Sequence, residues 1–259
     1  MTITSTTALR PIGLDELIEV GSLQTRVDRK YALTGADAEM ALALVDPSTR
    51  VLEIDGVSEL GYTSVYLDTD GLDTYLLAAR GRRRRFKVRS RTYESNGASF
   101  LEVKTRSGEH TVKHRLPGAH VLNGRLTDEG AAFVGHTLRR AGVRNPPVAR
   151  LSAAMRVDYR RVTLFHEATA SRATIDSELA WWDVRTGSWL ARPALSIIET
   201  KTTGRAAGMD RLLWSLGHRP DSVSKYATAL AAMHAHLPSN KWRPVLKEHF
   251  QPVESLACA

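Results

Sequence analysis

The segment from Arg80 to Arg91, RGRRRRFKVRSR, constrains the fold more than any other part of the chain. It holds eight basic side chains in twelve residues and no acidic one. Its second half alternates, so Arg85, Lys87, Arg89 and Arg91 are separated by single uncharged residues. Because successive side chains of a β-strand point to opposite faces, this pattern predicts a strand with four cations on one face. Aligned like charges repel unless an anion lies among them, and the oxygens of phosphate match the arginine fork.

The overall charge also indicates an anionic partner. The net charge is +8 and the isoelectric point is near 9.8, which favours nucleic acid, polyphosphate, a nucleotide or an acidic membrane surface. At 259 residues and 42% hydrophobic content the chain can bury a sizeable core. The single cysteine, Cys258, excludes an internal disulfide framework. No apolar segment approaches the roughly 20 residues of a spanning helix. We therefore expect a soluble, cytoplasmic protein without a membrane segment of its own.

Hydrophobic periodicity and turn residues predict an antiparallel α+β fold. Short turns such as Ser95-Asn96-Gly97 separate the middle strands, and no alternating βαβ pattern is present. Thr34 and Thr127 are expected N-caps of two helices. The predicted strands are Leu23–Leu33, Tyr62–Asp68, Arg84–Tyr93, Ser99–Arg106, Thr111–Leu116, Ala153–Phe165, Arg172–Trp182 and Ala194–Thr202. The predicted helices are Ala36–Val45, the segment from Thr127 to Gly142, Gly208–Leu216 and Ser224–His236.

The predicted strands share one property, an apolar face opposite a charged face. The charged positions are Asp28 and Lys30, Glu102 and Lys104, Lys113 and Arg115, Arg172 and Asp176, and Glu199 and Lys201. One interpretation is a sheet packed on helices with its charged face in water. The other is a closed barrel whose charged faces line the interior, with helices on the apolar outside. The predominance of cations favours the second, because a surface selected for solubility normally mixes both signs.

Six short motifs carry a family resemblance. They are KY at Lys30, SVYLDT at Ser64–Thr69, KVRSRTY at Lys87–Tyr93, LEVKT at Leu101–Thr105, IIETK at Ile197–Lys201 and SKY at Ser224–Tyr226. Together, in this order, they resemble the VTC domain, the catalytic core of the vacuolar transporter chaperone complex. That domain is a branch of the triphosphate tunnel metalloenzymes. The motifs extend over about residues 24–235.

The resemblance implies an eight-stranded antiparallel β-barrel, a triphosphate tunnel with helices packed outside. It divides the chain into an N-terminal arm (1–20), the tunnel domain (21–240) and a C-terminal tail (241–259). The implied activity is that of a metal-dependent polyphosphate polymerase, a transferase that moves the γ-phosphate of ATP onto inorganic polyphosphate. The implied cofactor is Mn²⁺ or Mg²⁺, and the implied partners are ATP and polyphosphate or triphosphate rather than nucleic acid.

The resemblance also implies a role for each residue that matches a family motif. The implied catalytic cations are Lys30, Arg89, Arg91, Lys104, Lys113, Arg172, Lys201 and Lys225. The implied substrate-binding residues are Arg80, Lys87, Arg115 and Ser224. Glu199 is the first candidate metal ligand and Glu102 the second; the alternative for each is charge balance with neighbouring cations.

Two other functions stay open at the level of sequence. Hydrolytic tunnel enzymes carry E-x-E-x-K on the first strand, whereas this chain has Arg26, Asp28 and Lys30, which weakens the hypothesis of a triphosphatase or nucleoside triphosphate hydrolase. A non-catalytic binder of polyphosphate or RNA is the third hypothesis. RNA binding is disfavoured because Phe86 lies on the face opposite the cations and could not stack on bases beside them. The sequence contains neither a GxxxxGK[ST] phosphate loop nor a Ser-His-Asp arrangement.

Overall fold

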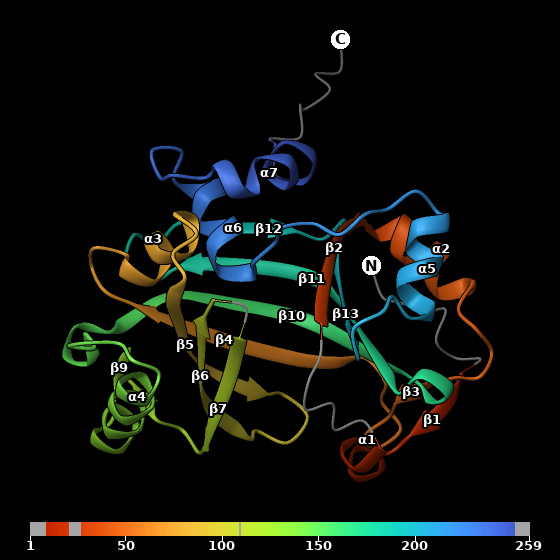
Figure 1. The fold of residues 1–259 in the computed structure, drawn as a ribbon, viewed down its shortest axis with the longest axis horizontal. Coiled ribbons are helices and arrows are strands. Elements are labelled where there is room, and N and C mark those ends of the chain that lie inside the picture. Colours follow the sequence, from red (N-terminus) through yellow and green to blue (C-terminus); the bar gives the residue numbers. More distant parts are fainter. Residues whose placement is uncertain (1–8, 21–26, 109, 252–259) are drawn as a thin grey trace.

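The computed structural model describes residues 9–20, 27–108 and 110–251 (Figure 1). Its centre is a curled sheet whose main path has eight strands, each antiparallel to its neighbours. In path order they are β2 (Val27–Thr34), β13 (Leu195–Thr202), β11 (Ser171–Asp183), β10 (Ser152–His166), β4 (Leu60–Asp68), β5 (Arg84–Tyr93), β6 (Ser99–Ser107) and β7 (His110–Pro117). The predicted eight-stranded antiparallel α+β fold is therefore confirmed, as a half-barrel. Residues 23–26 of the first predicted strand lie outside the described residues.

Five short strands extend this path. β1 (Arg10–Ile12) pairs in parallel with β3 (Thr49–Leu52), which also pairs with β10. β12 (Trp189–Arg192) pairs with β11, and β8 (Val121–Leu122) forms a ladder with β9 (Arg125–Leu126). The segment expected to be an N-terminal arm thus contributes a strand and a short helix, α1 (Leu14–Val20). Leu17 of α1 is buried, so this part of the arm packs on the domain.

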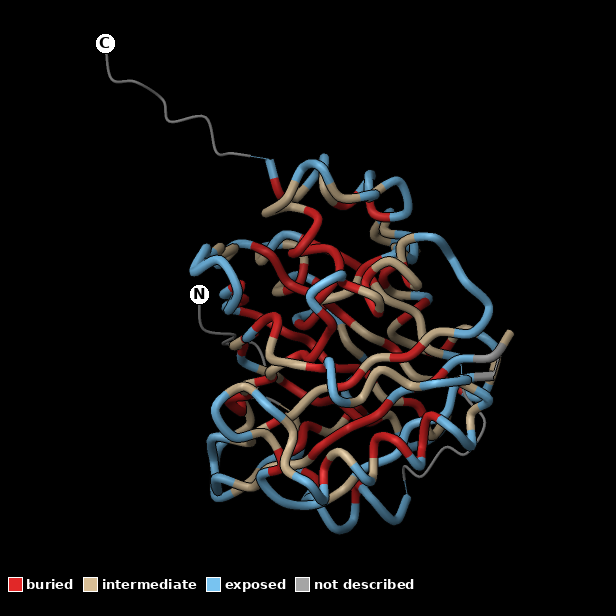
Figure 2. Tube along the Cα trace, turned by 90° about the vertical axis from the view of Figure 1, so that its left-hand side faces the viewer, coloured by how far each residue is buried: buried red, intermediate tan, exposed pale blue. Residues whose placement is uncertain are grey.

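Three helices cover the outer, apolar face of the sheet. These are α2 (Gly35–Ala43), α5 (Gly208–Ser215) and α4 (Asp128–Arg140). Thr34 and Thr127 cap α2 and α4 as predicted, since each hydroxyl accepts a bond from a backbone N–H at 3.1 Å. Under α4 the outward side chains of β5 and β6, among them Phe86 and Val103, form a buried cluster. Figure 2 shows the buried segments concentrated inside these layers.

A fourth helix, α6 (Lys225–Met233), packs against the inner face of the sheet. There it joins α3 (Asp73–Ala79) and α7 (Arg243–His249) over one large apolar cluster. The reason is that the inner face is not charged throughout. Leu195 and Ile197 share the inner face of β13 with the charged residues further along and need an apolar cover.

The C-terminal segment belongs to the same core. Trp242, Val245 and Phe250 are buried in the cluster beneath α7. The boundary expected at residue 240 therefore does not separate residues 241–251 from the domain. Three short 3₁₀ helices, Val148–Arg150, Glu167–Thr169 and Asn240–Trp242, complete the described elements.

Candidate functional site

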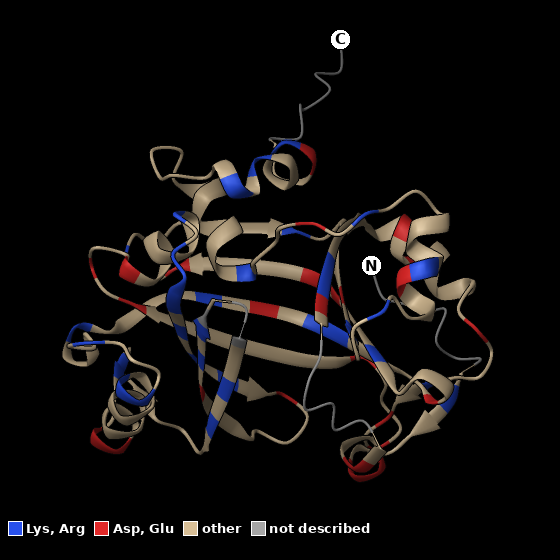
Figure 3. Cartoon of the chain, in the orientation of Figure 1, with Lys and Arg blue, Asp and Glu red and all other residues tan. Residues whose placement is uncertain are grey.

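The strand alternation places one charged surface, here called the inner face, on the hollow side of the curled sheet. Residues directly opposite in antiparallel strands point the same way, so the pairs Lys30–Glu199 and Arg89–Glu102 fix the faces of four strands. Figure 3 shows basic and acidic residues along these strands. On the inner face, cationic side chains outnumber carboxylates. Its charged members include Asp28, Lys30, Lys87, Arg89, Arg91, Glu102, Lys104, Lys113, Arg115, Arg161, Asp176, Glu199 and Lys201.

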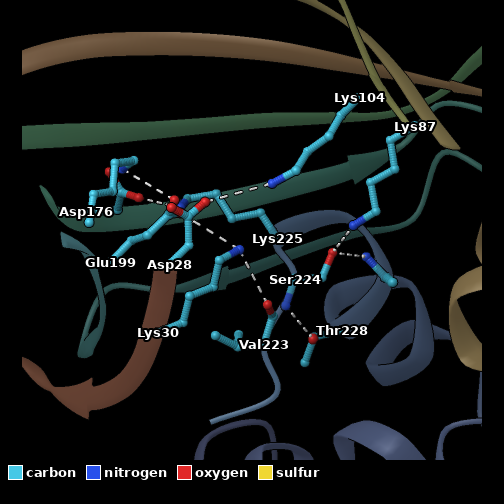
Figure 4. Close-up of polar contacts among 12 residues, drawn as sticks. Asp28, Lys30, Lys87, Lys104, Asp176, Glu199, Val223, Ser224, Lys225 and Thr228 are labelled. Carbon is cyan, nitrogen blue, oxygen red and sulfur yellow. Dashed lines mark hydrogen bonds and ion pairs between the residues drawn. The ribbon is translucent and has the colours of Figure 1, made fainter. Parts of the chain in front are cut away.

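Side chains connect the two halves of the sheet across this face. Lys104 Nζ on β6 lies 3.9 Å from Asp28 Oδ2 on β2, although these strands are far apart along the path. The start of α6 makes two further connections: Lys87 on β5 donates to Ser224 Oγ at 2.7 Å, and Lys225 contacts Asp176 on β11. Figure 4 shows these side chains converging. The structure therefore gathers most of the predicted site residues into one group.

Glu102 holds three cations together. Its carboxylate lies 2.6 Å from Arg89 Nη2, 2.5 Å from Lys113 Nζ and 2.9 Å from Arg115 Nε, and its side chain is only 3% exposed. Burial alone would raise the pKa of Glu102, but Arg89, Arg91 and Lys113 lower it far below its ordinary value. Glu102 is thus an ionised counter-charge whose two oxygens are both bonded.

Glu199 lies in a similar but looser environment. Lys201 Nζ is 3.2 Å and Lys30 Nζ 3.7 Å from its carboxylate. Burial acts to raise the pKa of Glu199, and Lys201, Lys30 and Lys104 together bring it well below the ordinary value. The carboxylate is therefore ionised at neutral pH.

A buried triad lies at the start of α6, and sequence reasoning identified Lys225 in it but missed Arg161. Arg161 on β10 donates to both oxygens of Asp176, at 2.5 and 2.8 Å, and Lys225 contacts the same carboxylate. The Lys225 ammonium also lies 4.8 Å from the ring centroid of Tyr159. Because Arg160 and Arg161 are adjacent, alternation alone did not indicate which one faces inward. Asp176 was recognised only as a charged position.

Tyrosine rings support the arginines of the inner face. Tyr62 and Tyr159 stack with centroids 5.3 Å apart, and the Arg91 guanidinium lies 5.5 Å from the Tyr62 ring. Arg89 donates to the Tyr66 hydroxyl at 3.1 Å. These contacts hold two long side chains in defined orientations.

Burial, together with nearby cations, lowers the pKa of several lysines on the inner face. Burial, followed by repulsion from Lys30 and Lys104, lowers the pKa of Lys87 well below its ordinary value. Burial likewise lowers the pKa of Lys104 and Lys201. Burial and the adjacent arginines outweigh Glu102 and lower the pKa of Lys113 to about 7. A bound anion would relieve this repulsion.

Two predicted residues are not part of this group. Arg80 is exposed at the end of α3 and lines a pocket on the outer side of β5. Arg172 lies opposite Lys201 but at the end of the sheet, where its Nη2 donates to the carbonyl of Leu17 in α1 at 2.5 Å. Arg26 lies outside the described residues.

The donor set bears on the implied metal. Within the described ranges, no group of three or more His, Cys, Asp or Glu side chains is placed to hold a metal ion. Mg²⁺-type ions commonly bind through one or two carboxylates together with substrate phosphates. Glu199 fits that role better than Glu102, since its cations are two and lie farther from its carboxylate, at 3.2 and 3.7 Å. Glu102 fits less well, because three close cations occupy it.

None of the helices in the described part of the chain is long and apolar enough to cross a membrane.

Comparison with known proteins gives one family. The model of the VTC domain matches residues 25–234, which include every strand of the main sheet path and all of α6. Curated proteins yielded no match.

Among solved structures, a putative adenylate cyclase from Bacillus halodurans is 12% identical. Its match covers 77% of this chain and 94% of that one, with a TM-score of 0.48. A putative adenylyl cyclase from Hippeastrum, described as having a dominant triphosphatase activity, is 15% identical, with 80% and 96% covered and a TM-score of 0.46. A protein from Pyrococcus horikoshii is 13% identical, with 79% and 98% covered and a TM-score of 0.43.

Proposed function

The chain belongs to the VTC domain family, and from this membership we propose that it is a metal-dependent polyphosphate polymerase that uses ATP. The structural observation that carries the proposal is the inner face itself. Its cations come from β2, β5, β6, β7, β10, β13 and α6 and exceed the carboxylates among them. Such a surface fits a string of phosphates, because each phosphate brings oxygens that arginine and lysine can bind.

The proposed reaction is a phosphoryl transfer between two phosphate chains. A terminal oxygen of polyphosphate attacks the γ-phosphorus of ATP and forms a new P–O bond. The bond from that phosphorus to the oxygen bridging to the β-phosphate breaks, and ADP leaves with the electron pair. Phosphoryl transfer of this kind needs positioning and charge neutralisation more than covalent help from the protein.

The side chains held most firmly are suited to the transferred phosphate. Arg89 and Arg91 are oriented by tyrosines, and Arg161 and Lys225 by Asp176. Donors that are already oriented lose little freedom when charge develops on the phosphate oxygens.

The lysines of the inner face are suited to the remaining phosphates of both chains. We assign Lys30, Lys87, Lys104, Lys113 and Lys201 to this role, with Arg115 and Ser224 beside them. The catalytic role of Arg172, which lies at the far end of the inner face, stays a prediction.

Glu199 is the proposed ligand of Mn²⁺ or Mg²⁺. When bound, the ion would neutralise charge on the phosphate oxygens. Lys30 and Lys201, which now face the Glu199 carboxylate, would then be available to the phosphates.

Three of the four carboxylates that the described strands place on the inner face are poorly suited to activate a water molecule. Glu102, Asp176 and Glu199 all contact cations, and their pKa values are lowered, which makes them weak bases. The described inner face carries no histidine. A phosphate oxygen is already ionised and needs no base, whereas water would have to be activated.

The test is to incubate the protein with ATP and Mn²⁺ and to resolve the phosphate products on a gel. We expect a ladder of long chains, lost in Arg91→Ala and in Glu199→Ala while thermal unfolding still shows a folded protein. Arg205→Ala, at an exposed position near α5, is the control for loss of one positive charge. Orthophosphate as sole product would indicate a hydrolase, and binding without turnover a non-catalytic binder; either result refutes the polymerase. A cytoplasmic location stays a prediction.

A further inference from the structure

A second basic pocket lies outside the inner face and is not used by the proposed reaction. It has a volume of about 300 Å³, within the size range of small ligand sites, and lies between the end of α3 and the loop after α4. Its floor is apolar and includes Phe86, the residue on β5 that points away from the inner face. Four of its lining residues are arginines: Arg80, Arg82, Arg144 and Arg150.

The charge of this pocket is poorly compensated from within. Asp73 is the only acidic residue among those that line it, and its carboxylate lies 3.4 Å from Arg150 Nη2. Three arginine charges therefore remain in excess within a small volume. A surface that serves solubility alone normally intersperses both signs, so this arrangement indicates a bound anion.

The arginine-rich segment connects the pocket to the inner face. Arg85 lies on the inner face of β5 directly opposite Arg106 on β6. Its Nη1 donates at 2.8 Å to the backbone carbonyl of Arg82, whose side chain lines the outer pocket. Burial and then Arg106 lower the pKa of Arg85, and Lys241 is repelled by both arginines. Cations thus continue from the inner face, around the first residues of β5, to the outer pocket.

The backbone forms a tight turn between α3 and β5. Gly81 has φ +62°, a conformation that favours glycine, and the N–H of Arg82 donates to the carbonyl of Leu77 at 3.0 Å. The arginines at 80 and 82 are therefore directed by a closed turn at the end of α3.

We propose that the outer pocket binds a segment of a phosphate chain that leaves the inner face past Arg85. It acts as a second polyphosphate site, to which a long chain bound on the inner face extends and a triphosphate bound there does not. The identity of the ligand rests on the proposed function. A chain held at two sites gains affinity because the second contact is intramolecular. Arg80, predicted to bind substrate, would do so here.

The test compares the binding of long-chain polyphosphate and of tripolyphosphate by isothermal titration calorimetry at two salt concentrations. The variant Arg82→Gln/Arg144→Gln removes two pocket charges. The matched control, Arg205→Gln/Arg211→Gln, removes two exposed charges beside α5, on the other side of the molecule in Figure 1. We expect the pocket variant to bind long chains about tenfold more weakly, with a shallower salt dependence, and tripolyphosphate unchanged. The control should bind both as the unmodified protein does.

Three outcomes would overturn the proposal: unchanged long-chain affinity in the pocket variant, an equal loss in the control, or an equal loss for tripolyphosphate. If the protein binds a single-stranded RNA more tightly than polyphosphate, and the pocket variant loses this binding, the pocket is an RNA site and not a polyphosphate site. The binding assay needs no turnover. If the unmodified protein forms no product ladder but the pocket variant selectively loses long-chain binding, the polymerase is refuted and the pocket site stands. If the ladder forms but the pocket variant binds long chains normally, the pocket site alone is refuted.

Discussion

Replacing Glu102 by glutamine tests whether this residue is the counter-charge of the inner face. The change keeps the size of the side chain and removes the charge that Arg89, Lys113 and Arg115 share. We expect a less stable protein that binds tripolyphosphate more tightly, because three cations lose their carboxylate and a phosphate can replace it.

The magnitude follows from burial. Removing one partner of a buried ion pair costs about 3–5 kcal/mol. Since Lys113 and Arg115 are 29% and 46% exposed, water screens part of the loss, and we take the lower end, about 3 kcal/mol. For a chain of this size that corresponds to a fall in Tm of roughly 6–12 °C. Tripolyphosphate at about 100 times its Kd adds about 2.7 kcal/mol to the free energy of unfolding and should therefore restore most of the lost stability.

The dependence on pH has a definite sign. Because the pKa of Glu102 is lowered on folding, its contribution is fully present above the unfolded value, near 4.5, and is lost as pH falls further. The difference in stability between the two proteins should therefore shrink in acid.

The assay is thermal unfolding of both proteins with and without tripolyphosphate, at pH 7 and below pH 4. Glu53→Gln, at an exposed position, is the control. Equal Tm values for Glu102→Gln and the unmodified protein would refute the reasoning. Weaker tripolyphosphate binding in Glu102→Gln would instead assign Glu102 to the metal or substrate.

Three further predictions concern protons, packing and metal. Tripolyphosphate binding at pH 8 should take up protons, because an anion raises the pKa of Lys113 from about 7. Calorimetry in buffers of different ionisation enthalpy measures this uptake, and Lys113→Arg should reduce it. Equal proton uptake by the variant and the unmodified protein would contradict the prediction. Trp242→Ala should cost about 3–5 kcal/mol, measured by urea unfolding, because Trp242 is buried under α7; a cost below 1 kcal/mol would contradict its place in the core. A chelator should abolish turnover of ATP and added Mn²⁺ restore it, and turnover that persists in the chelator would exclude the proposed metal.

The strands and most of the site could be predicted from the sequence because period-2 alternation was strong. Lys87, Arg89 and Arg91 reach the inner face as that pattern indicates. Arg161 could not be found in this way, since two adjacent arginines leave the facing ambiguous. Its partner Asp176 becomes evident only when β10 and β11 are paired.

Helix α3 was not predicted because the carboxylate that accepts from its first N–H groups lies on the preceding strand and not at the N-cap position. Asp68, at the end of β4, accepts bonds from the backbone N–H groups of Thr74 and Tyr75, at 2.8 and 3.0 Å. The Tyr226 hydroxyl of α6 donates to the same carboxylate at 2.7 Å. No residue directly before the helix signals its start, as Leu72 at the N-cap position has φ +57° and makes no side-chain cap.

The order of the strands has a consequence for biosynthesis. Among the described strands, β2 pairs with β13 alone, although more than 150 residues separate the two along the chain, and the inner face gains Ser224 and Lys225 later still. A nascent chain that stops before residue 195 has synthesised β2 without its partner and lacks Glu199. Pairing over such a sequence distance is slow to form. Ribosome-bound fragments of this protein should therefore hold phosphate chains only once the start of α6 has emerged.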